Sequence, residues 1–243
     1  YVAWNWKGGN ATSGTGDFTQ GGIASTCSRN VDAGFSIVSY TGTGTTGTVG
    51  HGLSSTPEMY IVKNRDTVEN WAVYTESMGN AKRLSLDSNG AETATNNWNS
   101  TSPTANVFTV YGGETRVNDS GDDYIAYCFH SVDGYSKVGS YTGNGSTDGT
   151  FVYTDFRPAF VMVKRTSGSN WVIFDYKRNP YNNVINNLYP NRSDAEAEYS
   201  NVQFDFTSNG FKGRGIDDEV NGSGETYVYL AIAETPFKYS NAR

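Results

Sequence analysis

The sequence predicts an all-β protein made of two tandem, homologous β-sandwich modules of a jelly-roll-like kind. Short runs rich in β-branched and aromatic residues, bounded by Gly, Asn, Ser or Pro, follow one another along the chain. Such runs are typical of a sandwich, and no helix longer than about two turns is expected. The chain of 243 residues also repeats itself, since residues 34–43 (GFSIVSYTGT) are echoed by residues 134–144 (GYSKVGSYTGN). Further matches at offsets of 100 to 104 residues indicate a duplicated domain.

The repeat sets the expected domain boundaries. Residues 1–33 are an N-terminal strand with an irregular arm, residues 34–133 are module one and residues 134–243 are module two. The expected strands of module one are 34–40, 47–51, 58–65, 71–77, 83–87, 107–111 and 123–130. Those of module two are 135–141, 149–154, 159–166, 171–177, 184–189, 202–206 and 226–234. The expected core residues are Phe35, Val62, Trp71, Tyr124 and Ala126, with Tyr135, Val163, Trp171, Tyr227 and Tyr229 as their partners.

The first residues match the expected closing strands of both modules. Residues 1–6 (YVAWNW) resemble 124–129 (YIAYCF) and 227–232 (YVYLAI). They therefore predict an ordered strand, the end of a preceding repeat, paired on this chain's own sandwich or with a neighbouring copy. On this interpretation the chain is a fragment or processed product of a longer protein.

Composition and net charge limit the kinds of partner that the protein is expected to bind. A net charge of -7 without a Lys/Arg cluster argues against binding nucleic acid or an anionic membrane through a basic face. No run of about 18 apolar residues predicts a membrane-spanning helix. Cys27 and Cys128 form no disulfide framework or zinc spacing, and Cys128 is expected to be a small buried hydrophobe. We expect no cofactor and no metal, although calcium binding by a carboxylate cluster stays open.

Signals for catalysis are weak. His51 and His130, the only histidines, are interpreted as structural. Carboxylates cluster at Asp122-Asp123 and at residues 217–219, where polar, glycine-flanked loops favour solvated acids over the facing pair of a glycosidase. No nucleophile motif occurs, and the SYTGxG turns lack the ending of a phosphate loop. The sequence predicts no catalytic residues.

Aromatic residues that occur in one module only are the candidate ligand-binding residues. Trp71 and Trp171 occupy equivalent places, which favours a packing role. The candidates are Trp98 in the polar loop NNWNST and Tyr181, Tyr189 and Tyr199 in the variable segment 179–201. Exposed aromatic rings among amide side chains are typical of sugar-binding faces. The alternative is that these rings hold long loops in place.

Three motifs carry a family resemblance. They are SIVSYTGTG followed by TGTVGHGLSSTPEMYIVKNR, the long run YIAYCFHSVDGYSKVGSYTGNGSTDGTFVYTDFRPAFVMVKR, and the ending AETPFKYSNAR. The whole chain resembles the repeated C-terminal module of large structural proteins of marine tailed bacteriophages, a family of uncharacterised function. The resemblance implies an extracellular location on the virion, in a tail fibre or other appendage, with other virion proteins and further copies as partners.

The leading hypothesis is a non-enzymatic structural and adhesive protein whose loops contact a host surface glycan or protein. One alternative is a purely architectural decoration or filament subunit. Another is a tail-associated glycan depolymerase that uses a carboxylate pair.

Overall fold

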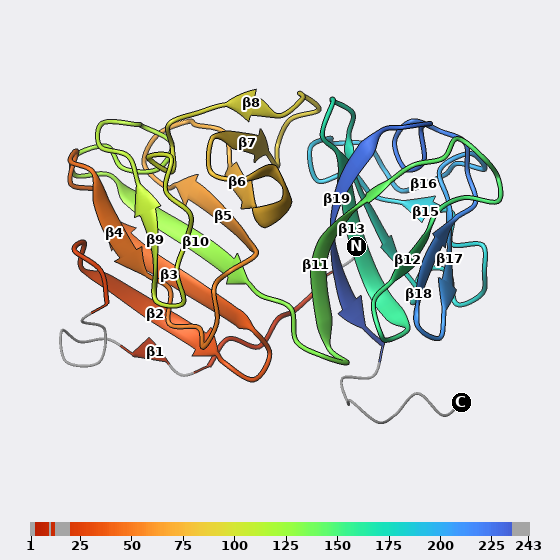
Figure 1. Ribbon diagram of the computed structural model, residues 1–243, viewed down its shortest axis with the longest axis horizontal. Helices are drawn as coiled ribbons and strands as arrows, with labels where there is room; N and C mark the ends of the chain where they lie inside the picture. The colour runs from red at the N-terminus through yellow and green to blue at the C-terminus, as the bar shows by residue number, and fades with distance from the viewer. Residues whose placement is uncertain (1–2, 10, 13–19, 235–243) are drawn as a thin grey trace. The chain divides into compact units, whose positions relative to one another are not determined.

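The computed structural model describes residues 3–9, 11–12 and 20–234, whose regular secondary structure is almost wholly β (Figure 1). The registers described between named strands are antiparallel, an isolated bridge between Ile23 and Val49 is parallel, and the only helical element in these ranges is a 3-10 turn, η1 (Glu76–Met78). The predicted all-β, sandwich-like fold is therefore confirmed. No helix in the described part of the chain has the length and apolarity needed to cross a membrane.

The chain divides into two compact units. Unit 1 comprises Tyr1–Arg83 and Thr93–His130, and unit 2 comprises Leu84–Glu92 and Ser131–Arg243. The segment Leu84–Glu92 lies within the first expected module, yet it belongs to unit 2. Unit 2 is thus completed by residues that precede the rest of it in sequence.

Unit 1 contains a large sheet packed on a small one. The large sheet has the order β1 (Ala11–Thr12), β2 (Ser25–Asn30), β3 (Phe35–Thr41), β10 (Asp123–Phe129), β5 (Met59–Asn64), β6 (Ala72–Thr75), β7 (Lys82–Ser85) and β8 (Thr93–Ala94). The small sheet pairs β4 (Gly47–Gly50) with β9 (Val107–Val110). The core joins Val38, Val62 and Ala126 of the large sheet to Val49 and Phe108 of the small one. Alternating side chains of the two sheets therefore form one hydrophobic layer.

Unit 2 has the same plan with fewer strands. Its main sheet has the order β11 (Ser136–Thr142), β19 (Thr226–Ala233), β13 (Pro158–Arg165) and β14 (Trp171–Asp175). A second sheet has the order β12 (Phe151–Tyr153), β18 (Gly210–Gly213) and β17 (Phe204–Thr207), and β15 (Asn186–Asn187) pairs with β16 (Ala197–Glu198). Val163 and Tyr229 of the main sheet share a core with Val152, Phe204 and Phe211 of the second sheet.

A stacked pair of tyrosines lies at corresponding positions in each unit. Tyr40 stacks on Tyr124 at 5.1 Å, and its hydroxyl donates to the carbonyl of Val117 at 2.7 Å. Tyr141 stacks on Tyr227 at 4.8 Å, and its hydroxyl donates to the carbonyl of Val220 at 2.6 Å. These pairs let the strands β3 and β11, and likewise β10 and β19, be compared residue by residue.

The expected core is largely confirmed. Eight of the ten predicted residues are buried: Phe35, Val62, Tyr124, Ala126, Val163, Trp171, Tyr227 and Tyr229. Trp71 and Tyr135 are only partly buried. Cys128 is fully buried, as predicted, and both cysteines are free thiols.

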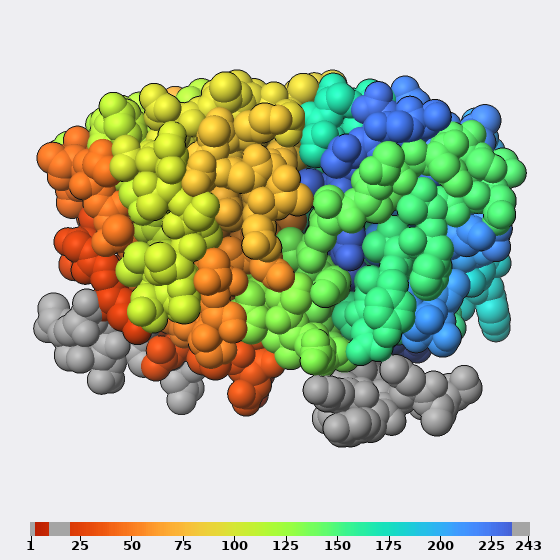
Figure 2. All heavy atoms as spheres, in the orientation of Figure 1, coloured from red at the N-terminus to blue at the C-terminus, as the bar shows by residue number. Residues whose placement is uncertain are grey.

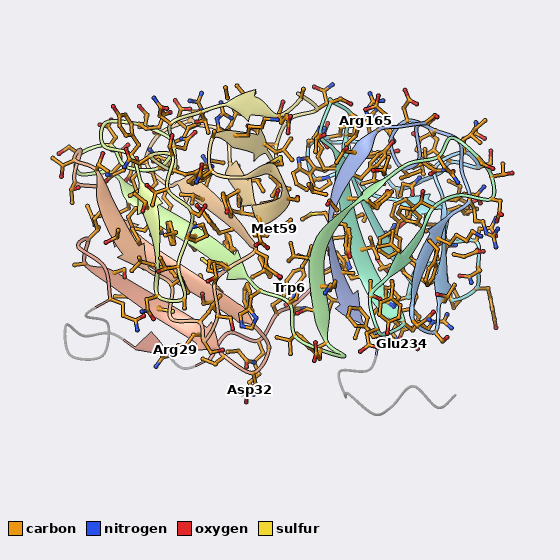
Figure 3. The ribbon with its side chains drawn as sticks, viewed as in Figure 1. Trp6, Arg29, Asp32, Met59, Arg165 and Glu234 are labelled. Atoms are coloured by element: carbon orange, nitrogen blue, oxygen red, sulfur yellow. The ribbon has the colours of Figure 1, made fainter. Side chains whose placement is uncertain are left out.

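The N-terminal region differs from the prediction. Residues 3–6 form no strand, whereas residues 1 and 2 lie outside the described ranges. Trp6 (Figure 3) instead lies against the ring of Phe35, at 6.5 Å between centroids. Residues 25–30, expected to be irregular, form β2 and pair along β3. The sequence likeness to the closing strands gave a wrong prediction for residues 3–6, because β10 is a strand through its pairing with β3 and β5 on both sides.

Candidate binding site

Trp98, predicted to present an exposed ring to a ligand, lies instead inside the core. Its side chain is fully buried in the core of unit 1 and makes T-shaped contacts with Tyr60 at 4.9 Å and Tyr74 at 6.0 Å. The indole N–H donates to the carbonyl of Lys82 at 3.0 Å. The polar neighbours of Trp98 in sequence occupy the surface, while the ring itself fills the space between tyrosines of two strands.

The three candidate tyrosines of unit 2 separate into a pair and a single residue. Tyr189 and Tyr199 meet edge to face at 6.1 Å, with Tyr189 8% and Tyr199 40% exposed. Tyr181 is 83% exposed and, within the described residues, makes no ring contact with that pair. Only Tyr189 and Tyr199 therefore belong to a common surface.

A polar network surrounds Tyr189. Its hydroxyl donates to Glu219 Oε2 at 3.0 Å, and Asn170 Nδ2 donates to Glu219 Oε1 at 2.6 Å. Asn191 Nδ2 donates in turn to Asn170 Oδ1 at 2.8 Å, and the backbone N–H of Trp171 donates to Asn191 Oδ1 at 3.0 Å. Each amide thus has a fixed orientation, because each one both donates and accepts within the network.

A cation lies over the tyrosine ring. The guanidinium carbon of Arg192 is 5.1 Å from the ring centroid of Tyr189, within the range of a cation–π contact. Arg192 also forms an ion pair with Asp194. Burial, followed by the charge of Glu219, raises the pKa of Tyr189. This phenol therefore remains a hydrogen-bond donor at physiological pH.

Three residues of this network, Asn170, Asn191 and Arg192, border a pocket of about 380 Å³, and Tyr189 and Glu219 lie behind them. It is lined by Asp87, Ser88, Asn89, Asn170, Asn191 and Arg192, all of them polar. The first three come from Leu84–Glu92, so this segment supplies one wall. The volume is in the range of pockets that hold a small molecule or a few sugar rings.

Buried hydrogen bonds hold that wall in place. The indole N–H of Trp171 donates to the carbonyl of Ser85 at 2.8 Å, and Lys164 Nζ donates to the carbonyls of Asn89, at 3.2 Å, and of Ser169. Both side chains are fully buried. Burial lowers the pKa of Lys164 to about 8, and the charge of Arg165 acts in the same direction. The wall is therefore attached through backbone carbonyls, which exist whatever side chains the segment carries.

Sequence reasoning missed all six residues that line this pocket, and it missed Glu219, which accepts a hydrogen bond from Asn170 behind the lining. Asn170 precedes Trp171 in a duplicated Asn-Trp pair, which suggested packing alone. Glu219 belongs to an acidic cluster that was considered only for catalysis or calcium. Asn170 and Glu219 are 49 residues apart, so only the fold shows that they meet.

The acidic clusters are engaged in structural contacts. Asp122 accepts from Asn64 Nδ2 at 2.8 Å, and Asp218 pairs with Arg165 (Figure 3) at 2.9 Å. Within the described residues, no three His, Cys, Asp or Glu side chains form a group that could hold a metal ion. His51 is buried, accepts from the N–H of Leu53 on Nδ1 and lies with Nε2 at 3.1 Å from the carbonyl of Thr104. That ring is a fixed part of a turn.

A second pocket, of about 570 Å³, lies in unit 1. It is lined by Lys7, Gly8, Gly9, Arg29, Asn30, Val31 and Asp32, of which Arg29 and Asp32 are labelled in Figure 3. This lining contains no linked set of side-chain amides. The pocket of unit 2 is the better candidate because its binding groups are already oriented.

The comparisons with known proteins give a family and no relative of known function. Residues 1–236 match the family described as Domain of unknown function (DUF7483), and the chain belongs to that family. No curated protein and no solved structure matches the chain.

Proposed function

We propose that this member of the domain family is a non-enzymatic structural and adhesive protein of a bacteriophage particle, part of a tail fibre or appendage. Its pocket in unit 2 binds a glycan of the host surface. The sequence resemblance to phage structural proteins supports the location. The network from Asn191 through Asn170 and Glu219 to Tyr189 supports the binding role and is the observation that carries the proposal.

The chemistry of the pocket suits a ligand rich in hydroxyl groups. Amide side chains offer a donor and an acceptor at fixed spacing, as a sugar diol requires. The guanidinium of Arg192 adds further donors at the rim, and Asp87 adds acceptors. Because the amides of Asn170 and Asn191 are oriented before binding, little side-chain entropy is lost when a ligand arrives.

Adhesion is favoured over hydrolysis by the role of Glu219. Both of its oxygens accept hydrogen bonds, from Asn170 and Tyr189, so this carboxylate positions binding groups. A depolymerase would instead need two carboxyl groups placed across the scissile bond, one of them as an acid.

Binding and cleavage can be measured together on a panel of bacterial surface polysaccharides. We expect wild-type protein to retain a polysaccharide without releasing reducing ends, and Asn170→Ala with Arg192→Ala to lose retention while staying folded. Arg65→Ala with Asn96→Ala, two exposed residues of unit 1, is the matched control and should bind normally. Release of reducing ends would make the protein a depolymerase. Absence of retention by wild type across the panel would leave the architectural alternative.

A further inference from the structure

The outer edge of the main sheet is paired along the whole of β3 in unit 1 but only at the start of β11 in unit 2. In unit 1, β2 pairs with β3 over its whole length, from Ser25 opposite Tyr40 to Asn30 opposite Phe35. In unit 2, β11 is the end of the order β11-β19-β13-β14. Within the described ranges Val132 bridges Ser136 at the start of β11, and no strand continues along the rest of its outer side. Green atoms of the segment that contains β11 and the following turn lie at the surface in the view of Figure 2.

The same difference occurs at the edge of the smaller sheet. In unit 1, Ile23 N–H donates to the carbonyl of Thr48 at 2.9 Å, and Gly22 N–H donates to Thr48 Oγ1 at 2.9 Å. Ile23 forms a parallel bridge with Val49 and is buried, 5% exposed, in the core. The segment that leads into β2 therefore closes both edges of unit 1 with one continuous stretch of chain.

The corresponding edge strand of unit 2 is β12. Val49 pairs with Phe108 in unit 1, and Val152 pairs with Phe211 in unit 2. On either side of Val152, Phe151 is 44% and Tyr153 57% exposed. Two aromatic rings thus face water at the position where unit 1 has Thr48 and Gly50.

Backbone groups of β11 also point outward. The bonds from Ala233 N–H to Tyr135 O, 2.8 Å, and from Gly143 N–H to Glu225 O, 2.9 Å, show which residues face β19. Because pairing alternates along an antiparallel strand, Ser140 directs its N–H and C=O to the open side. Ser39, at the corresponding position of unit 1, pairs there with Thr26. Ser131 Oγ accepts from the N–H of Val138 at 3.0 Å and Thr150 Oγ1 donates to the carbonyl of Thr142 at 2.6 Å, so the backbone of Ser140 lies between two occupied positions. Residues 138–142 (VGSYT) contain no charge or proline, the usual protection of an edge.

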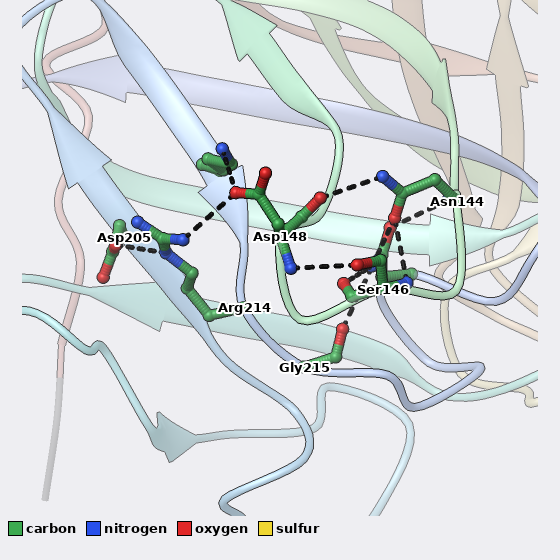
Figure 4. A network of polar contacts seen from close by, with 8 residues as sticks. Asn144, Ser146, Asp148, Asp205, Arg214 and Gly215 are labelled. Atoms are coloured by element: carbon green, nitrogen blue, oxygen red, sulfur yellow. Dashed lines mark hydrogen bonds and ion pairs between the residues drawn. The ribbon is translucent and has the colours of Figure 1, made fainter.

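A hydrogen-bonded turn holds the two open edges in register. Between β11 and β12, Asn221 Nδ2 donates to Asn144 Oδ1 at 3.1 Å and to the carbonyls of Ser146, 2.8 Å, and Gly215, 3.1 Å (Figure 4). Asp148 pairs with Lys212 at 2.6 Å beside β12. The edges are therefore preformed, as a site that adds a strand requires.

We propose that this open edge of unit 2, made by β11 and β12, binds an extended segment of another polypeptide. The segment has the pattern of residues 21–27, with an apolar side chain like that of Ile23 at the place that Ile23 occupies in unit 1. Main-chain hydrogen bonds to Ser140 supply affinity, and burial of the Ile23-like side chain between the sheets supplies specificity. Such strand addition links the protein to a neighbour in an assembly, and it is independent of the glycan pocket.

A labelled peptide tests the proposal on the full chain. The peptide has the sequence of residues 20–30 with Cys27→Ala, and its binding is followed by fluorescence anisotropy. We expect saturable binding to wild-type protein and an affinity at least about tenfold weaker for Ser140→Pro, which removes the outward N–H. Ser193→Pro, in an exposed loop of unit 2, is the matched control and should bind like wild type. A peptide that also carries Ile23→Asp should not bind.

Two outcomes overturn the proposal. One is absence of binding to folded wild-type protein. The other is undiminished binding to folded Ser140→Pro, since the peptide would then be replacing the chain's own segment in unit 1. If Ser140→Pro does not fold, Phe151→Lys with Tyr153→Lys takes its place, because both side chains are exposed and charge on an edge opposes strand addition.

Discussion

Replacing Trp98 by alanine tests whether this side chain stabilises the core of unit 1 or serves to bind a ligand. The side chain is fully buried, makes two T-shaped aromatic contacts and donates one hydrogen bond. Each aromatic pair contributes about 0.5–1.5 kcal/mol beyond the area it buries, and the hydrogen bond contributes a similar amount. Loss of the whole side chain from a packed core costs about 3–5 kcal/mol. We expect Trp98→Ala to lower the free energy of unfolding of unit 1 by that amount.

Hydrogen exchange measured by mass spectrometry suits this test because it reports on each unit separately. In Trp98→Ala, amides of β5, β6 and β9 should exchange faster while amides of β13 and β19 keep their wild-type rates. Trp98→Phe keeps a ring in place and should show a smaller effect, mainly the lost bond to Lys82. A change of less than about 1 kcal/mol in Trp98→Ala would contradict the packing described here and return Trp98 to the candidate binding residues.

Three further predictions concern single side chains. Burial lowers the pKa of His51 below its usual 6.5, so the folded state binds a proton less readily than the unfolded state. The free energy of unfolding, measured by denaturant titration, should therefore be constant above about pH 6.5 and fall as the pH drops below it. The fall should be smaller in a His51→Gln variant. Trp171→Phe removes the bond to the carbonyl of Ser85, so amides of residues 84–92 should exchange faster and unit 2 should lose about 1 kcal/mol or more; unchanged exchange there would contradict the anchoring role. Tyr181→Ala, at an 83% exposed position, should change thermal stability by less than about 0.5 kcal/mol and leave polysaccharide retention intact; lost retention would move the site to that loop.

Strands were predictable where the apolar or alternating sequence pattern matches the place of the strand in its sheet. Apolar or alternating runs such as 58–65 and 226–234 form β5 and β19 because both lie inside a sheet, between two neighbours. β2 escaped prediction since its sequence, STCSRN, has one apolar side chain, Cys27, and is a strand only through its pairing with β3. Local sequence cannot report a partner that lies elsewhere in the chain.

The candidate site was predictable only in part, for a similar reason. Tyr189 and Tyr199 lie in the variable segment that differs between the modules, and they do meet. The groups that orient Tyr189 come from distant positions, Asn170 and Glu219, which no spacing rule connects. Trp98 shows the opposite error, because a polar sequence neighbourhood was interpreted as exposure of the ring.

The central claim, that the polar pocket of unit 2 binds a sugar, is tested most directly by saturation-transfer NMR. Saturation of the protein's protons spreads through the protein and is transferred to any sugar held against the lining of the pocket, which includes Asn170 and Arg192. With a polysaccharide retained by wild type, we predict transfer to ring protons of the sugar that disappears in Asn170→Ala with Arg192→Ala and persists in Arg65→Ala with Asn96→Ala. Equal transfer in all three proteins would contradict the claim and place the bound sugar elsewhere on the molecule.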